Sequence, residues 1–341
     1  MSALSLPYLD PLSQALANLT SPEILASLTL TEYLATFAPS QQHEKLPGVD
    51  RTNFTAPVED GVELWIYKTE GLSEDVPLPY IFFIHGGGWS VGSIEEYDSI
   101  VRDLALRTGF PVVFPEYTLA PEVQFPVQHN QCYESLKWLT ENGESLGLQG
   151  RNFTLAGDSA GGESDRRVPR KLGHAEHTNK MIGHLAAGLN IMSIERKEFE
   201  IPFNVFICPI TSADYNAPPT LSEYELFGGP FISEPILRGM AGFYMPREED
   251  RASVLGSPRS MPDEVAAQFP PTLIVVGSAD VLRDAGKLLG EKLQTQGVDC
   301  AVVEGHGQLH DTVVSEAARQ GPTPKALMTL IASEITARLT S

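Results

Sequence analysis

The chain has 341 residues, of which 42% are hydrophobic, enough for the core of one large α/β domain or two smaller ones. Its formal net charge of −20 would repel another polyanion, which argues against nucleic acid or an anionic membrane as a partner. The three cysteines, Cys132, Cys208 and Cys300, are widely spaced and form neither a CxxC pattern nor a disulfide framework. No stretch of about 18 uninterrupted apolar residues occurs, so we expect no membrane span.

The N-terminal stretch, residues 1 to about 50, has clustered apolar positions interrupted by prolines, a pattern typical of short helices. It lacks a basic segment at its start, and Asp10 lies inside its apolar part, so it does not resemble a secretory signal peptide. A cytoplasmic location is therefore the default expectation.

After this stretch, apolar strands alternate with amphipathic helices. Residues 55–68 suggest antiparallel strands at the start of a sheet. A helix follows that has the capping-box pattern Ser93 and Glu96 at its start and Gly109 at its end. The alternation predicts an α/β fold with a mostly parallel central sheet that is covered by helices on both faces.

A serine flanked by glycines ends the apolar run of residues 152–162, NFTLAGDSAGG. Ser159 is the centre of a G-x-S-x-G pattern, in which a strand turns sharply into a helix and presents the serine hydroxyl. Because so tight a turn strains the serine backbone, Gly157 and Gly161 must lack bulk. We therefore interpret Ser159 as a nucleophile.

A second glycine cluster, HGGGW at 85–89, follows the strand predicted over 80–85. We expect the backbone N–H groups of Gly86 and Gly87, with that of Ala160, to converge on an oxyanion that develops during reaction. Four further residues are expected to support this loop without reacting themselves: His85, Gly88, Trp89 and Asp158.

Two more predicted strands are followed by an acid and by a histidine. Asp280 follows the strand over 272–277, and His310 follows the strand over 300–305. Serine, acid and histidine, each just beyond a strand end, stand in the chain order of the α/β-hydrolases. The sequence therefore predicts a catalytic triad of Ser159, Asp280 and His310.

Some other residues compete for these roles. Asp284 is a second acid on the same segment, but it lies further from the strand end than Asp280. His306 competes with His310, which the spacing from Gly307 favours. Three histidines suggest a metal site, but no carboxylate cluster joins them, so we expect no metal and no other cofactor: His174, His177 and His184.

With these motifs the sequence resembles the hormone-sensitive-lipase-like esterases of the α/β-hydrolase superfamily. The resemblance covers roughly residues 79–341. It rests on five segments: HGGGW at 85–89, EYTLAPE at 116–122, GDSAGG at 157–162, SADVLRD at 278–284 and GQLH at 307–310. The resemblance implies a single α/β-hydrolase domain over 1–341, with helical cap elements at about 1–50 and 211–262. Val281, where this family usually has a proline, is a mild departure.

Residues 163–183 are a more serious departure. They contain Pro169, little apolar periodicity and five basic residues in an otherwise acidic chain. Deleting them joins GDSAGG directly to HLAAGLNIM, the helix expected behind the nucleophile. The codons of residues 162–164 and 182–183 can encode a GTGAGT splice donor and an AG acceptor. We therefore interpret 163–183 as a retained intron, with a genuine surface loop and a basic binding insert as alternatives.

These residues predict a serine carboxylesterase that hydrolyses small or medium acyl esters through an acyl-enzyme. An amidase, a deacetylase or an arylformamidase can use the same triad, and an inactive ligand-binding protein on this fold is the alternative from another class. The expected partner is a small-molecule ester, and the oligomeric state does not follow from the sequence. Because the suspected intron is fungal in style, a role in fungal secondary metabolism is a further hypothesis.

Overall fold

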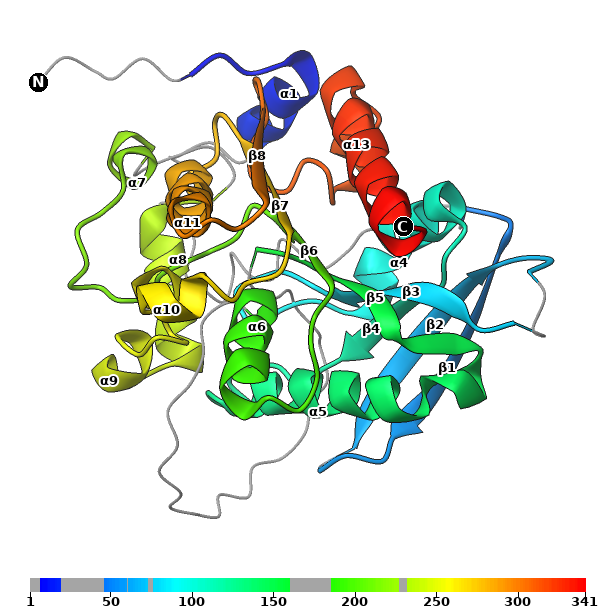
Figure 1. Cartoon of the computed structure of the whole chain (residues 1–341). Coiled ribbons are helices and arrows are strands. Elements are labelled where there is room, and N and C mark those ends of the chain that lie inside the picture. Colours follow the sequence, from blue (N-terminus) through cyan, green and yellow to red (C-terminus); the bar gives the residue numbers. More distant parts are fainter. Residues whose placement is uncertain (1–6, 20–45, 60, 73–75, 160–184, 227–231) are drawn as a thin grey trace, which may run out of the picture.

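The central element of the fold is an eight-stranded sheet with the strand order β1-β2-β4-β3-β5-β6-β7-β8 (Figure 1). The computed structural model describes residues 7–19, 46–59, 61–72, 76–159, 185–226 and 232–341. The strands are β1 (Val49–Ala56), β2 (Val62–Thr69), β3 (Leu78–Ile84), β4 (Val112–Glu116), β5 (Leu148–Asp158), β6 (Phe203–Ile207), β7 (Thr272–Gly277) and β8 (Cys300–Gly305).

The sheet is antiparallel at one side and parallel over the rest. β1 pairs antiparallel with β2, and β2 with β4. All pairings from β4 through β3, β5, β6 and β7 to β8 are parallel. The predicted mostly parallel sheet is thus confirmed, and its antiparallel part begins at Val49, before the expected position. The carboxyl ends of the six parallel strands share one edge of the sheet.

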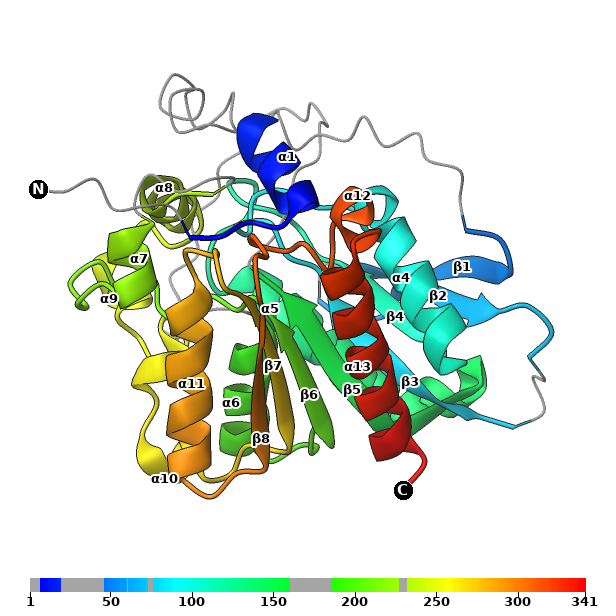
Figure 2. The ribbon, with the colours of Figure 1, turned by 90° about the horizontal axis from the view of Figure 1, so that it is seen from above.

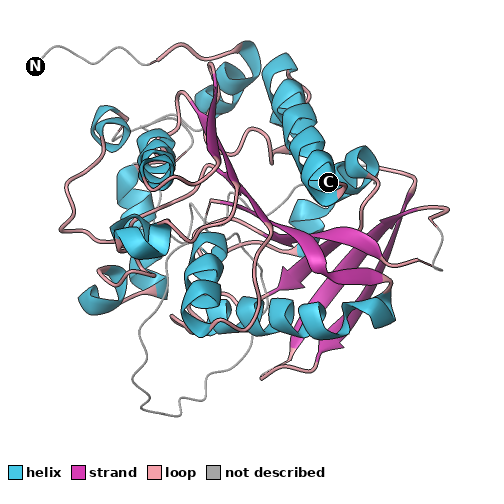
Figure 3. Ribbon diagram, viewed as in Figure 1, coloured by secondary structure: helices cyan, strands magenta, loops and turns pink. Residues whose placement is uncertain are grey.

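Helices cover both faces of the sheet (Figure 3). The α-helices of the described residues are α1 (Pro11–Leu19), α4 (Ile94–Thr108), α5 (Val127–Asn142), α6 (Leu185–Arg196), α7 (Leu221–Glu225), α8 (Glu234–Tyr244), α9 (Glu248–Arg251), α10 (Asp263–Ala266), α11 (Arg283–Thr295), α12 (Glu316–Arg319) and α13 (Pro322–Leu339). Within the described part of the chain, none of them is both long and apolar enough to cross a membrane.

Two hydrophobic layers hold the helices to the sheet. One layer packs α4 and α13 on one face, and the other packs α5, α6 and α11 on the opposite face (Figure 2). Strand β3 serves both layers, because Ile81 and Phe83 point into the first and Tyr80, Phe82 and Ile84 into the second. A parallel strand that is buried on both faces is apolar along its whole length, which explains the YIFFI run.

Helices from both segments that were expected to form a cap lie at the carboxyl edge of the sheet. In α8, Met240 packs against Gly88, just after β3, so that a Cβ on this glycine would lie 2.3 Å from the Met240 sulfur. In α7, Ser222 donates a 2.9 Å hydrogen bond to the carbonyl oxygen of Val281, beyond β7. Residues 20–45 of the N-terminal segment lie outside the described residues.

Helix α1 is attached to the loops that follow β7 and β8. The carboxylate of Asp10 caps α1 and accepts a hydrogen bond from the side-chain amide of Gln308. Further along the helix, Ala17 packs with Ala279 and Leu309 in a small apolar cluster. The start of the chain is therefore in contact with the residues that precede positions 280 and 310.

The N-terminus of α4 is stabilised differently from the prediction. The side chain of Ser93 makes no cap hydrogen bond, so the predicted capping box is wrong. The N–H of Ile94 instead donates to both carboxylate oxygens of Glu116, at 3.2 and 3.3 Å. The carboxylate of Glu116, the last residue of β4, thus caps α4 in place of the Ser93 side chain. At the other end, Gly109 has a left-handed φ of 71°, as expected for a C-cap.

Glu116 gives a prediction for stability. Burial raises the pKa of its carboxyl group to about 7, although the hydrogen bond from Ile94 opposes the shift. The folded protein binds the Glu116 proton more tightly than the unfolded chain does. The protonated carboxyl group therefore contributes its full stabilisation of the fold below about pH 4.5, and this contribution is lost as the pH rises through 7. Glu116→Gln should therefore raise Tm relative to the wild type at pH 8 by a few degrees more than at pH 5.

Thermal unfolding followed by circular dichroism at both pH values measures this difference. Glu291→Gln, an exposed control in α11, should shift Tm equally at pH 5 and pH 8. An equal shift for Glu116→Gln as well would contradict the titration of Glu116 in this range.

Candidate active site

Ser159 stands at the sharp turn that ends β5. Its φ of 33° lies in the left-handed region, which residues other than glycine rarely adopt. The turn is fixed by a 3.0 Å hydrogen bond from the Ser159 N–H to the carbonyl oxygen of Ile207. A Cβ at Gly157 would lie only 3.0 Å from the carbonyl oxygen of Ile84 and 3.3 Å from the Cβ of Ala186. The strained serine and the small neighbour that the pattern predicts are therefore both present.

Two hydrogen bonds connect Ser159 to a histidine and an acid from neighbouring strand ends. Nε2 of His310 lies 2.7 Å from Oγ of Ser159, and Nδ1 of His310 lies 2.9 Å from Oδ2 of Asp280. The other carboxylate oxygen of Asp280 accepts a 2.8 Å hydrogen bond from the N–H of Leu282. All three side chains are buried. The structure thus brings together the nucleophile, base and acid that the sequence analysis selected.

The rival acid and the rival histidine are engaged elsewhere. Asp284 pairs with Arg283 at 2.8 Å and accepts a 2.7 Å hydrogen bond from the N–H of Ser222. His306 is exposed and stacks on Tyr8, with 5.0 Å between the ring centroids. In the described part of the chain, neither rival is bonded to the serine.

Asp158 holds the glycine loop that follows β3. The N–H of Gly86 donates a 2.8 Å hydrogen bond to Oδ1 of Asp158, and the hydroxyl of Tyr97 donates one of 2.8 Å to Oδ2. The expectation that the Gly86 N–H receives an oxyanion is therefore wrong, because this donor is already used. The next two residues, Gly87 and Gly88, have positive φ angles of 100° and 69°, which glycine adopts freely.

His85 and Trp89, at the two ends of the glycine run, are packed into the core. The His85 ring stacks on Tyr117 at 4.2 Å, and the Tyr117 hydroxyl donates a 3.0 Å hydrogen bond to the His85 carbonyl oxygen. Burial lowers the pKa of His85 to about 3, so its ring stays neutral near pH 7. Trp89 stacks on Tyr244 of α8 at 5.3 Å. Ala160, the remaining expected oxyanion donor, lies outside the described residues.

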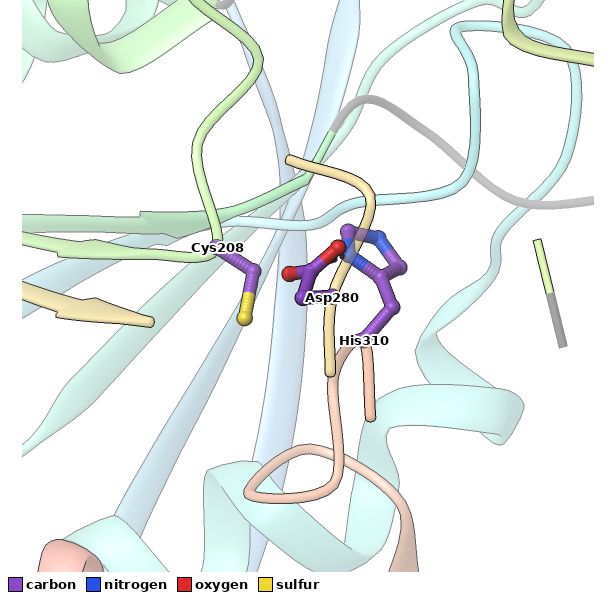
Figure 4. A group of neighbouring side chains, drawn as sticks. All are labelled: Cys208, Asp280 and His310. Carbon is purple, nitrogen blue, oxygen red and sulfur yellow. Dashed lines mark hydrogen bonds and ion pairs between the residues drawn. The ribbon is translucent and has the colours of Figure 1, made fainter. Parts of the chain in front are cut away.

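The sequence analysis missed two groups that adjoin the histidine. Asp311 places Oδ2 3.0 Å from Nε2 of His310, and an acid next to the candidate base was a signal that was not used. Cys208 follows β6 directly. It is buried, but its sulfur lies within 4.8 Å of the ligand atoms of Asp280 and His310 (Figure 4). Thiol, carboxylate and imidazole can bind metals. Because Asp280 and His310 are bonded to each other, we assign no metal here.

A hollow beside these residues is built mainly from the segment 210–282. Its empty volume is about 530 Å³, open solvent included. Apolar lining residues include Trp89, Leu237 and Leu282, which come from the glycine loop, α8 and the loop after β7. The charged lining residues are Asp214, Glu223, Arg238 and Arg259. The hollow is connected to the site through Leu282, whose N–H is bonded to Asp280, and through Trp89, which follows Gly88 directly.

A second hollow, of about 350 Å³ with open solvent included, lies at Ser159. Its lining contains Asp158 and Ser159 on one side and Leu185 and Ala186 on the other. These residues flank the undescribed stretch 160–184. Ser159 and Leu185, the described residues on either side of 160–184, therefore line the same hollow.

Known proteins resemble this chain over most of its length. A family model described as the alpha/beta hydrolase fold matches residues 81–165 and 183–314. An esterase from Gibberella moniliformis is 37% identical over 261 residues, which are 76% of this chain and 74% of that protein. An esterase from Fusarium pseudograminearum is 35% identical over 298 residues, 86% of this chain and 83% of that protein. The crystal structure of carboxyl esterase 2 from the fungus Tuber melanosporum has a TM-score of 0.80 at 30% identity and covers 97% of this chain and 99% of its own.

These matches and the sheet confirm the α/β-hydrolase fold that the motifs predict. The relatives are esterases in name, which agrees with the chemistry of a serine at a strained turn beside a histidine. The chain belongs to the hormone-sensitive-lipase-like esterases of the α/β-hydrolase fold and is a carboxylesterase.

Proposed function

We propose that this carboxylesterase hydrolyses esters of small and medium acyl chains through Ser159, His310 and Asp280. The proposal is carried by the two consecutive hydrogen bonds, 2.7 Å from His310 to Ser159 and 2.9 Å from His310 to Asp280. A general base must reach the proton that it removes, and a third group must hold the imidazole in the right tautomer. The two distances support both conditions.

In the proposed reaction His310 takes the proton of Ser159 while Oγ attacks the ester carbonyl. Asp280 keeps the proton of His310 on Nδ1 and stabilises the imidazolium that forms. His310 then protonates the leaving alcohol, and water repeats the sequence on the acyl-enzyme to release the acid. These steps need no metal and no organic cofactor, since the three side chains supply the nucleophile and the base.

Backbone N–H groups are proposed to receive the negative oxygen of the tetrahedral intermediate. Since the N–H of Gly86 is bonded to Asp158, the donors from the glycine loop are those of Gly87 and Gly88. The N–H of Ala160 is the third donor, as expected from the sequence motif. Each such donor contributes on the order of 100- to 1000-fold in rate.

Substitution of the nucleophile tests the triad. Ser159→Ala should lower kcat/KM for p-nitrophenyl acetate by at least about 1000-fold, because no other side chain can form the acyl-enzyme. Asp284→Asn, which removes the rival acid, should retain most of the activity. Circular dichroism checks that both variants are folded. Activity in Ser159→Ala close to that of the wild type would refute the triad and favour another mechanism on this fold.

The hollow next to the triad is proposed to receive the acyl chain. Leu237 and Leu282 contribute apolar walls, and Trp89 closes the side next to the glycine loop. Such walls select by size, and one methylene is worth about 1–3 kcal/mol in a hydrophobic pocket. The apolar walls next to the triad support a short or medium acyl group as the occupant of this hollow.

Enlarging this hollow should change the preference for acyl length. For Leu237→Ala we expect the ratio of kcat/KM for p-nitrophenyl octanoate to that for the acetate to rise about 3- to 10-fold. Leu288→Ala, at an exposed leucine of α11, is the matched control and should leave the ratio unchanged. All substrates of the series share the same alcohol, so the ratio reports only on the acyl chain. An unchanged ratio in Leu237→Ala would contradict acyl binding in this hollow, which would then hold the alcohol or no part of the ester.

We also propose that residues 163–183 are a retained intron and do not belong to the functional enzyme. The family model matches up to residue 165 and again from 183, and leaves the residues between them unmatched. Ser159 and Leu185 line the same hollow, so a short connection suffices to join β5 to α6. A direct connection would bring the positive end of the α6 dipole to the nucleophile.

Removal of 163–183 tests this proposal. The shortened chain should have at least about 10-fold higher kcat/KM for p-nitrophenyl acetate than the full chain, and Ser159→Ala should abolish the gain. Sequencing of the mature transcript is the independent measurement. A transcript that contains these codons, together with equal activity of both chains, would make the segment a tolerated loop.

The biological setting remains part of the proposal. The relatives from Gibberella moniliformis and Fusarium pseudograminearum are fungal, which agrees with the suspected fungal intron. A role in fungal secondary metabolism and a cytoplasmic location stay predictions. The cap formed by the segments at about 1–50 and 211–262 also stays a prediction, supported by the position of α1, α7 and α8 at the carboxyl edge.

A further inference from the structure

Asp311 competes with Ser159 for the same nitrogen. Nε2 of His310 lies 2.7 Å from Oγ of Ser159 and 3.0 Å from Oδ2 of Asp311. The Asp311 backbone has a left-handed φ of 51°, and its side chain is 17% exposed. Its other oxygen, Oδ1, is buried and has no hydrogen-bond partner among the described residues. The Asp311 carboxylate therefore points toward the catalytic base rather than toward solvent, and it does not cap a helix.

A ring nitrogen carries either one proton or one lone pair, so its two neighbours favour different states. If Nε2 of His310 is protonated, it donates to the Asp311 carboxylate, and Ser159 is not activated. If Nε2 is unprotonated, it accepts the Ser159 proton, but its lone pair then faces the negative oxygens of Asp311. The ion pair with Asp311 thus stabilises the form of His310 that cannot act as a base.

Four other titratable groups surround this pair, and Asp280 among them increases the effect. They come from four elements: Asp280 after β7, Cys208 after β6, Asp158 in β5 and Tyr97 in α4. Burial opposes ionisation of the His310 ring, but Asp280 and Asp311 outweigh it and raise the pKa of His310 well above 6.5. Burial also raises the pKa of Asp311, while His310 lowers it. The His310 ring thus lies between two acids, Asp280 at Nδ1 and Asp311 at Nε2.

We propose that Asp311 acts through His310: it pairs with the Nε2 proton in the free enzyme and so confines ester hydrolysis to more alkaline pH. This inference rests on the proposed triad. Before turnover one proton must leave the His310–Asp311 pair to solvent, after which the neutral ring can accept the Ser159 proton. In the transition state the Nε2 proton is held between His310 and the reacting oxygen and is no longer donated to Asp311, so removing Asp311 should shift the pH dependence without lowering the plateau by much.

Asp311→Asn removes the charge and retains the size and the left-handed backbone, which asparagine tolerates well. The acid limb of kcat/KM for p-nitrophenyl acetate should move to lower pH by about one unit or more, which means about 10-fold higher activity at the foot of the wild-type limb. The plateau at high pH should change by less than about 3-fold. Asp311→Gly, which also suits a positive φ, should shift the limb in the same direction.

The matched control is Asp299→Asn, which removes one negative charge at a 67% exposed site beside Arg338. It should leave the midpoint of the limb in place. An NMR titration of the His310 ring, assigned with His310→Gln, gives a readout that needs no turnover. We expect a midpoint above 6.5 in the wild type and a midpoint at least about one unit lower in Asp311→Asn.

The outcomes separate the inference from the proposed triad. Coincident NMR midpoints in the wild type and both folded Asp311 variants would overturn the role of Asp311 and leave the triad intact. A Ser159→Ala enzyme with full activity would instead overturn the triad. An equal shift in Asp299→Asn would also overturn the inference, since general charge would then account for it.

Discussion

The strained turn at Ser159 is the constraint on which the site depends. A serine with a positive φ persists only where its surroundings hold it, and here β6 binds its N–H while Gly157 leaves room for Ala186. The parallel sheet does the rest, because β3, β5, β7 and β8 all end at one edge. Loops that are distant in sequence thus deliver a glycine run, an acid and a histidine to one point. The two hydrophobic layers fix those strands.

Three carboxylates around this turn have three different roles. Asp158 binds the N–H of Gly86 and so shapes the glycine loop. Asp280 binds Nδ1 of His310, and Asp311 lies at Nε2. One chemical group therefore holds the glycine loop, binds one nitrogen of His310 and lies beside the other nitrogen, depending on which atom it faces. The strong net negative charge of the chain extends into its active site.

The parts of the site that could be predicted are those that short sequence motifs specify. The G-x-S-x-G and HGGG motifs stand out in the sequence, and β7 and β8 could be recognised from their apolar runs, which located Asp280 and His310. The missed parts depend on neighbours in space. The N–H of Gly86 is bonded to the carboxylate of a residue 72 positions away, and Glu116 caps the N-terminus of α4 in place of Ser93. The direction of the Asp311 carboxylate follows from a positive φ that no pattern specified.

The two acids that flank His310 also influence what happens after the ester bond is broken. Hydrolysis turns a neutral substrate into an anion, and this anion is formed next to Asp280 and Asp311, which are partly or fully withdrawn from solvent. Like charges repel more strongly where water is scarce. From this repulsion we expect the released acid to bind the site weakly and to inhibit the next turnover little.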